Sequence, residues 1–132
     1  MLHLFLGAST ANIDTVVRCS SSTVRACGVT FGAEAATPLR GSIEAAAEVL
    51  RPFLVTPSGE AVFESLWRLN SAALPEVASE LDGVAEGANI SLRDVVIASL
   101  ATEIGWFANR EGFNSTAAKS CTDYHSLGGE LR

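Results

Sequence analysis

The chain has 132 residues, 48% of them hydrophobic and 18% charged, with a formal net charge of −6 at pH 7. This composition is typical of one small globular domain and excludes a disordered chain. The negative charge argues against nucleic acid and against an anionic membrane as partners, and no apolar run reaches the roughly 18 residues of a membrane helix.

The first 27 residues differ in character from the rest of the chain. The segment Met1–Gly7 is apolar but lacks the basic start of a secretory signal, and residues 8–27 are rich in Ser, Thr and Arg and poor in acid. This composition has a faint likeness to a transit peptide, but we interpret residues 1–27 as a poorly ordered leader. Because the tail Glu130–Arg132 is not a peroxisomal address, cytoplasm is the predicted location.

Helical periodicity begins near residue 38 and predicts about four helices before residue 108. The first two helices are indicated by apolar stripes at helical spacing, Ile43, Ala46, Ala47, Leu50, Phe53 and Leu54, then Val62, Phe63, Leu66, Trp67 and Leu69. Pro52 is expected to end or kink the first helix, because proline lacks the N–H group. Thr56 and Pro57 form a typical start for the second, and Trp67 and Trp106 are expected in the core.

Two further helix starts occur later in the chain. Pro75 opens a third helix, whose inward-facing stripe is predicted to consist of Val77, Leu81, Val84, Ala85 and Ala88. The stretch Gly87–Asn89 supplies the stop. Ser91 and Asp94 approximate a capping box for a fourth helix, with the acid at the third position. From Gly105 to Ser120 the pattern dissolves, which predicts an exposed loop.

Charge and cysteine usage add two expectations. Residues 34–86 carry nine acids against three arginines, most simply as solvated helix faces, with an acidic docking surface as the alternative. Cys19, Cys27 and Cys121 are odd in number and lack a paired spacing, which suits a reducing compartment with thiols used singly. Cys19 and Cys27 are therefore interpreted as incidental. No Cys/His spacing resembles a zinc site, and we predict neither a metal nor a cofactor.

Five stretches, in order, carry a resemblance to a known family. They are Gly28–Ala35, Gly83–Ala88, Ile90–Val96 with its Ser-Leu-x-Asp-apolar-apolar pattern, Thr102–Ile104, and Cys121-Thr122. Together they resemble the N-terminal part of the acyl-coenzyme A:6-aminopenicillanic-acid acyltransferase family, a group of cysteine N-terminal-nucleophile hydrolases. The resemblance implies that this chain is a mainly α fragment, with about four helices, of an αββα N-terminal-nucleophile fold.

The resemblance also divides the chain into regions and has clear departures. It implies a helical α-subunit-like region at residues 28–120 and the truncated start of a β-subunit-like region at residues 121–132. Phe31 stands where the family usually has His, so any role of that imidazole is absent. Ser99 and Ala101 stand where an Asn and an Arg commonly precede Thr-Glu.

The implied chemistry centres on Cys121, with Thr122 as a local contributor. In the family, the cysteine thiolate attacks the preceding carbonyl, here that of Ser120, and water then hydrolyses the resulting thioester. The freed α-amino group, with an ordinary pKa of about 7.7–8.0, serves as the base for its own thiol. The site would then move an acyl group from an amide or thioester onto an amine or water. His125 is interpreted as an exposed polar residue rather than a base.

The family's oxyanion donors lie well beyond the nucleophile, so these residues are expected to be inactive alone, and whether the chain is itself an enzyme stays open. A different class of function is a non-catalytic helical interaction domain, or a truncated gene product, in which Cys121 is an ordinary thiol. Helices without the sheet that they should cover would expose apolar stripes, so self-association is also expected.

Overall fold

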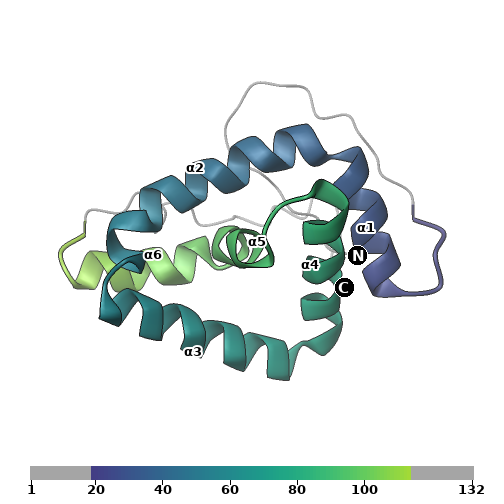
Figure 1. The fold of residues 1–132 in the computed structure, drawn as a ribbon. Coiled ribbons are helices and arrows are strands. Elements are labelled where there is room, and N and C mark those ends of the chain that lie inside the picture. Colours follow the sequence, from purple (N-terminus) through teal and green to yellow (C-terminus); the bar gives the residue numbers. More distant parts are fainter. Residues whose placement is uncertain (1–18, 114–132) are drawn as a thin grey trace, which may run out of the picture.

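The computed structural model describes residues 19–113, which form six α-helices joined by short turns (Figure 1). The helices are α1 (Val24–Glu34), α2 (Ala36–Leu54), α3 (Pro57–Ala73), α4 (Pro75–Ala88), α5 (Leu92–Ser99) and α6 (Ala101–Arg110). Residues 19–113 contain no β-strand.

This architecture corrects the fold expected from the sequence. The described residues make an all-helical unit of six helices rather than about four helices of an αββα fragment. Two helices were missed for different reasons. The sequence of α1 has no large apolar stripe to announce it, and the predicted fourth helix is divided at Leu100 into α5 and α6.

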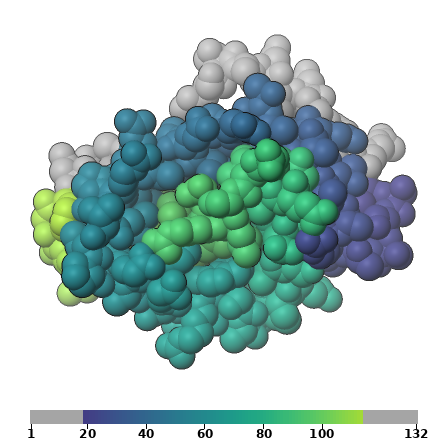
Figure 2. Space-filling model, viewed as in Figure 1, coloured from purple at the N-terminus to yellow at the C-terminus, as the bar shows by residue number. Residues whose placement is uncertain are grey.

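Large apolar side chains from α2, α4, α5 and α6 form the centre of the molecule. Leu50 and Ile104 are fully buried, and Phe53 and Val96 are 1% exposed. The long helix α2 crosses the unit, α3 runs along the opposite side, and α5 and α6 lie between them (Figure 1). Phe113, just after α6, packs on Phe53 with ring centroids 5.5 Å apart. In the space-filling view these helices close into one body (Figure 2).

Three predicted helix starts are confirmed, two of them with a side-chain cap. The Thr56 hydroxyl accepts a hydrogen bond from the Gly59 N–H at 3.0 Å, and Pro57 is the first residue of α3. Pro75 likewise opens α4. Ser91 caps α5 by accepting from the Asp94 N–H at 3.1 Å. Thr56 and Ser91 thereby satisfy N–H groups that the first turn of a helix leaves without an internal partner.

Several local predictions were wrong. Helix α2 does not end at Pro52 but continues to Leu54, because a proline in the last turn removes only one hydrogen bond near the helix end. Residues 105–110 belong to α6 rather than to a loop, since Ile104, Gly105 and Ala108 are buried against the core. Trp106 is 51% exposed, so it is not a core residue, whereas Trp67 is half-buried against the core.

No helix among residues 19–113 combines the length and apolar character needed to cross a membrane.

Candidate functional site

The predicted nucleophile and cleavage point lie outside the described residues. Cys121, Thr122 and the Ser120–Cys121 bond all come after residue 113, as do the β-subunit-like region at residues 121–132 and His125. The structure therefore bears on the other family-like stretches, which fall on α1, α4, α5 and α6.

The first two family-like stretches meet at a close contact between α1 and α4. Added Cβ atoms at Gly28 and Gly32 would clash with the carbonyl oxygens of Glu80 and Val84. In the same way, Cβ atoms at Gly83 and Gly87 would clash with the α1 backbone. The glycines of each helix are four residues apart and the contacts advance together, so the helices are parallel and their backbones touch. We call the contact made by these four glycines the glycine interface.

Arg25 forms two ion pairs at the edge of the glycine interface. Its Nε donates to the Asp82 carboxylate at 2.7 Å, and its second guanidinium nitrogen pairs with Glu86. The hydrogen bonds to Asp82 and Glu86, with the charges of both groups, raise the pKa of Arg25 above its ordinary value. Asp82 and Glu86 belong to the acidic stretch that was expected to form solvated helix faces. Their side chains are 46% and 57% exposed and also pair with Arg25 of α1.

Cys19 and Cys27 form a disulfide, with Cα atoms 5.3 Å apart. The prediction that these cysteines are incidental and used singly was therefore wrong. The bond closes a short loop over the start of α1, where the Thr23 hydroxyl accepts from the Ala26 N–H at 3.2 Å. The spacing of eight residues gave no recognisable motif, and Cys27 reaches Cys19 only because α1 begins between them.

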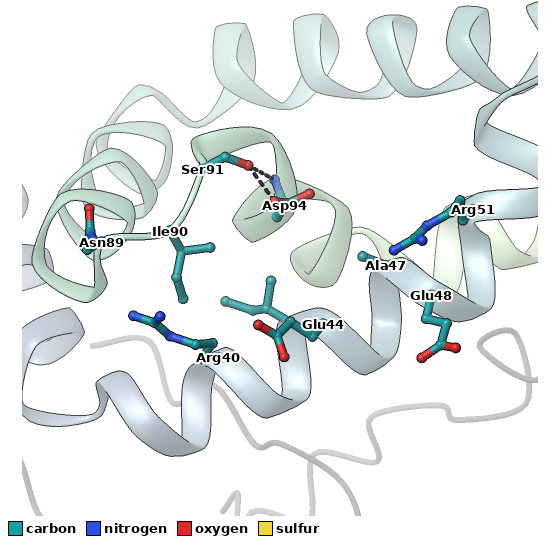
Figure 3. Close-up of a pocket in the computed structure, with 10 residues that line it drawn as sticks. Arg40, Glu44, Ala47, Glu48, Arg51, Asn89, Ile90, Ser91 and Asp94 are labelled. Atoms are coloured by element: carbon teal, nitrogen blue, oxygen red, sulfur yellow. Dashed lines mark hydrogen bonds between the residues drawn. The ribbon is translucent and has the colours of Figure 1, made fainter.

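The third family-like stretch forms the turn between α4 and α5. Asn89 adopts a left-handed conformation with φ of 53°, which ends α4 as predicted. The Ser91 hydroxyl donates to the Asp94 carboxylate at 2.6 Å while it accepts from the Asp94 N–H (Figure 3). Asp94 thus bonds the hydroxyl, whereas a full capping box would bond the backbone N–H of Ser91. This turn gives the Ser-Leu-x-Asp pattern a structural use.

A groove of about 600 Å³ lies between α2 and this turn. Its lining residues are Arg40, Ile43, Glu44, Ala47, Glu48, Arg51, Asn89, Ile90, Ser91 and Asp94. Arg40 and Arg51 stand toward the two ends of α2's groove wall, with Glu44 between them (Figure 3). Arg40 also donates to the Ala88 carbonyl at 3.1 Å, at the C-terminal end of α4 where a cation is favourable.

The chemistry of this groove is that of a polar surface. The Ser91 hydroxyl is engaged by Asp94 and serves as a helix cap, so it is not poised as a nucleophile. No group of three or more His, Cys, Asp or Glu side chains suited to a metal ion occurs among residues 19–113. Glu103 is exposed in the first turn of α6, away from this lining.

Sequence reasoning missed the Arg40–Ala88 bond and the glycine interface. Arg40 gave no signal, since its partner is a carbonyl 48 residues away. The glycine interface did have a sequence signal, because the pattern Gly-x-x-x-Gly occurs in both Gly28–Gly32 and Gly83–Gly87. These glycines were interpreted only as parts of a family pattern. Phe31, at the position of the family's His, is half-buried against the core.

Comparisons of the chain with protein-family models, with curated proteins and with solved structures gave no match.

Proposed function

We propose that this chain is the N-terminal segment of a self-cleaving cysteine acyltransferase or amidohydrolase, with Cys121 as the nucleophile. The proposal rests on the order of the family-like stretches along the sequence. One structural observation supports it: the stretches Gly28–Ala35 and Gly83–Ala88 face each other across the glycine interface. Two stretches that carry the resemblance and lie far apart in the sequence thus form a single contact.

In this proposal the described helices are a scaffold and the chemistry begins at Ser120. The Cys121 sulfur attacks the Ser120 carbonyl, the peptide nitrogen becomes the new α-amino group, and water releases the residues before it. The free amine then accepts the thiol proton during acyl transfer. The substrates are an acyl donor of the amide or thioester class and an amine or water acceptor. Thr122 contributes to the cleavage step, and no metal or cofactor takes part.

Cytoplasm is the location that we propose, and it bears on the Cys19–Cys27 bond. Cytosolic thiols are held reduced, whereas structural disulfides persist in oxidising compartments. In a reducing cytosol these two cysteines would therefore exist largely as thiols.

Self-cleavage can be tested on the gene product that contains these residues. Intact-mass and N-terminal sequence analysis should reveal a polypeptide whose first residue is Cys121. The Cys121→Ala variant should stay whole because it has no sulfur to attack the Ser120 carbonyl. Ser115→Ala, in the same polar stretch, should be cleaved like the unaltered protein. Recovery of the whole unaltered protein, while it still turns over small amides or thioesters, would refute the proposal.

A second candidate is a non-catalytic helical domain that binds another protein. The observation that favours it is the exposure of Leu69 and Leu74, 59% and 52%, near the end of α3. Exposed apolar surface of sufficient area is typical of interaction sites, and these two leucines would contribute to such a surface. An uncleaved gene product, together with a Cys121 thiol of ordinary reactivity, would favour this candidate over the first.

A further inference from the structure

Helix α1 is held in an unusual way compared with the other helices. Its only buried residues are Gly28 and Gly32, and it contributes none of the large side chains of the buried core. Phe31 packs against the core while remaining half-exposed. The main partner of α1 is α4, through the glycine interface and the exposed Arg25 ion pairs. Exposed ion pairs stabilise weakly, and α1 buries little apolar surface. Both contributions to the docking of α1 are therefore small.

A helix as short as α1 has little stability of its own. Isolated helices of fewer than about 12 residues are marginal in water, and α1 has 11 residues. Its first turn holds Arg25, which reaches Asp82 and Glu86 only when that turn is helical. Anything that orders the first turn therefore favours docking of the whole helix.

The Cys19–Cys27 disulfide orders this turn. It joins a residue before the helix to Cys27, the fourth residue of α1, and encloses the Thr23 cap and Arg25. A cross-link over a short loop reduces the conformational freedom of the undocked chain and leaves the docked state in place. Cys19 is exposed and Cys27 half-buried, so a soluble reductant has access to the bond.

We propose that the Cys19–Cys27 disulfide is a redox-sensitive clip that controls the docking of α1 on α4. When the clip is closed, α1 covers Gly83 and Gly87. When it is open, α1 frays from its first turn and uncovers this face of α4. The α2–α6 core keeps its own buried side chains in both states, because α1 contributes to it only the half-buried Phe31.

The switch is a two-electron exchange with a thiol reductant of the dithiol class. One reductant thiolate attacks a sulfur of the clip and displaces the other as a thiolate. The second reductant thiol then resolves the mixed disulfide, which leaves two protein thiols and an oxidised, cyclic reductant. A small-molecule disulfide such as oxidised glutathione reverses the reaction.

Hydrogen–deuterium exchange of the whole chain tests the clip, with dithiothreitol as the reductant. Reduction should raise exchange of the Val24–Glu34 amides by roughly 10- to 100-fold, the effect expected from opening a short closed loop. Amides of Leu92–Ser99 should be unchanged, and reoxidation should restore protection of α1. No change in α1, or an equal rise in α1 and α5, would overturn the proposal.

Matched cysteine variants separate this effect from other actions of the reductant. Cys19→Ser should exchange rapidly in α1 without reductant and should not respond to it. Cys121→Ser should respond to dithiothreitol as the unaltered chain does. Peptide mapping of the non-reduced protein should recover Cys19 linked to Cys27. Free thiols at both positions under oxidising conditions, or a link from either to Cys121, would contradict the clip. The test does not depend on cleavage at Cys121.

Discussion

Two contacts in this protein bring helices together by opposite means. At the glycine interface, α1 and α4 touch through their backbones, and the absence of side chains permits the approach. In the core, α2 meets α5 and α6 through large apolar side chains such as Leu50, Val96 and Ile104. The glycine interface brings two backbones into close contact with little apolar burial, whereas the core contributes most of the hydrophobic stabilisation. Close backbone packing and hydrophobic stabilisation are therefore found in different parts of one small unit.

This separation has a consequence for stability. Elements with few buried apolar side chains open locally at a lower free energy than the elements that form the core. Helix α1 belongs to the first kind and α2, α5 and α6 to the second. Substitutions should therefore divide into those that unfold the whole unit and those that release α1 alone.

The largest effect is expected in the core. Phe53→Ala should lower the free energy of unfolding by about 3–5 kcal/mol, because it removes a ring that is 1% exposed and leaves a cavity beside Phe113. Val55→Ala, at a side chain 75% exposed just after α2, is the matched control and should change stability by less than about 0.5 kcal/mol. Denaturant unfolding followed by circular dichroism measures both. A small effect of Phe53→Ala would place the main core elsewhere.

A smaller effect is expected at the glycine interface. Gly83→Ala should destabilise α1 docking by about 1–3 kcal/mol, because the new methyl group would overlap the Arg25 carbonyl oxygen. Gly41→Ala on α2 is its control. A Cβ there meets nothing within 4 Å, so the better helix propensity of alanine should stabilise by up to about 1 kcal/mol. Hydrogen exchange and denaturant unfolding measure both variants. Stability changes of opposite sign for Gly83→Ala and Gly41→Ala would sharpen the contrast, and changes of the same sign would remove it.

The smallest effect is expected for the ion pairs at the edge of the glycine interface. Arg25→Gln removes the charge that pairs with Asp82 and Glu86, so exchange in α1 should rise modestly at low salt. At high ionic strength the difference from the unaltered chain should shrink, because exposed charges are screened. Arg68→Gln, at an exposed position on α3, should leave α1 exchange unchanged. If Arg25→Gln behaves like Arg68→Gln at low salt, the ion pairs do not hold α1.

The same contrast explains which parts of the fold were predictable. The helices α2 to α5 follow from apolar periodicity and from local signals such as Thr56-Pro57, Pro75 and Ser91, whose physics acts within a few residues. Helix α1 was not predicted because its buried face consists of glycines, which weaken an isolated helix. Their role is visible only in the close backbone contact with α4. The continuation of α6 through residues 105–110 was not predicted because Gly105 has a low helix propensity, and the sequence does not show that Gly105 is buried.

The candidate site divides in the same manner. The Ser91–Asp94 cap was predicted, because both partners lie on one turn. The disulfide, the Arg25 ion pairs and the Arg40–Ala88 bond were not, since each depends on where the fold brings a partner. The nucleophile Cys121 rests on resemblance alone, and the self-cleavage experiment is its test.

The parallel pairing of α1 with α4 also sets an order of assembly. Arg25 and Asp82 are 57 residues apart, and α2, α3 and part of α4 must be synthesised before that partner exists. Contacts of high sequence separation form after local ones, because a long loop must close first. Helix α1 therefore leaves the ribosome well before its partner helix exists, and until α4 follows, the glycine face of α1 remains open to other chains.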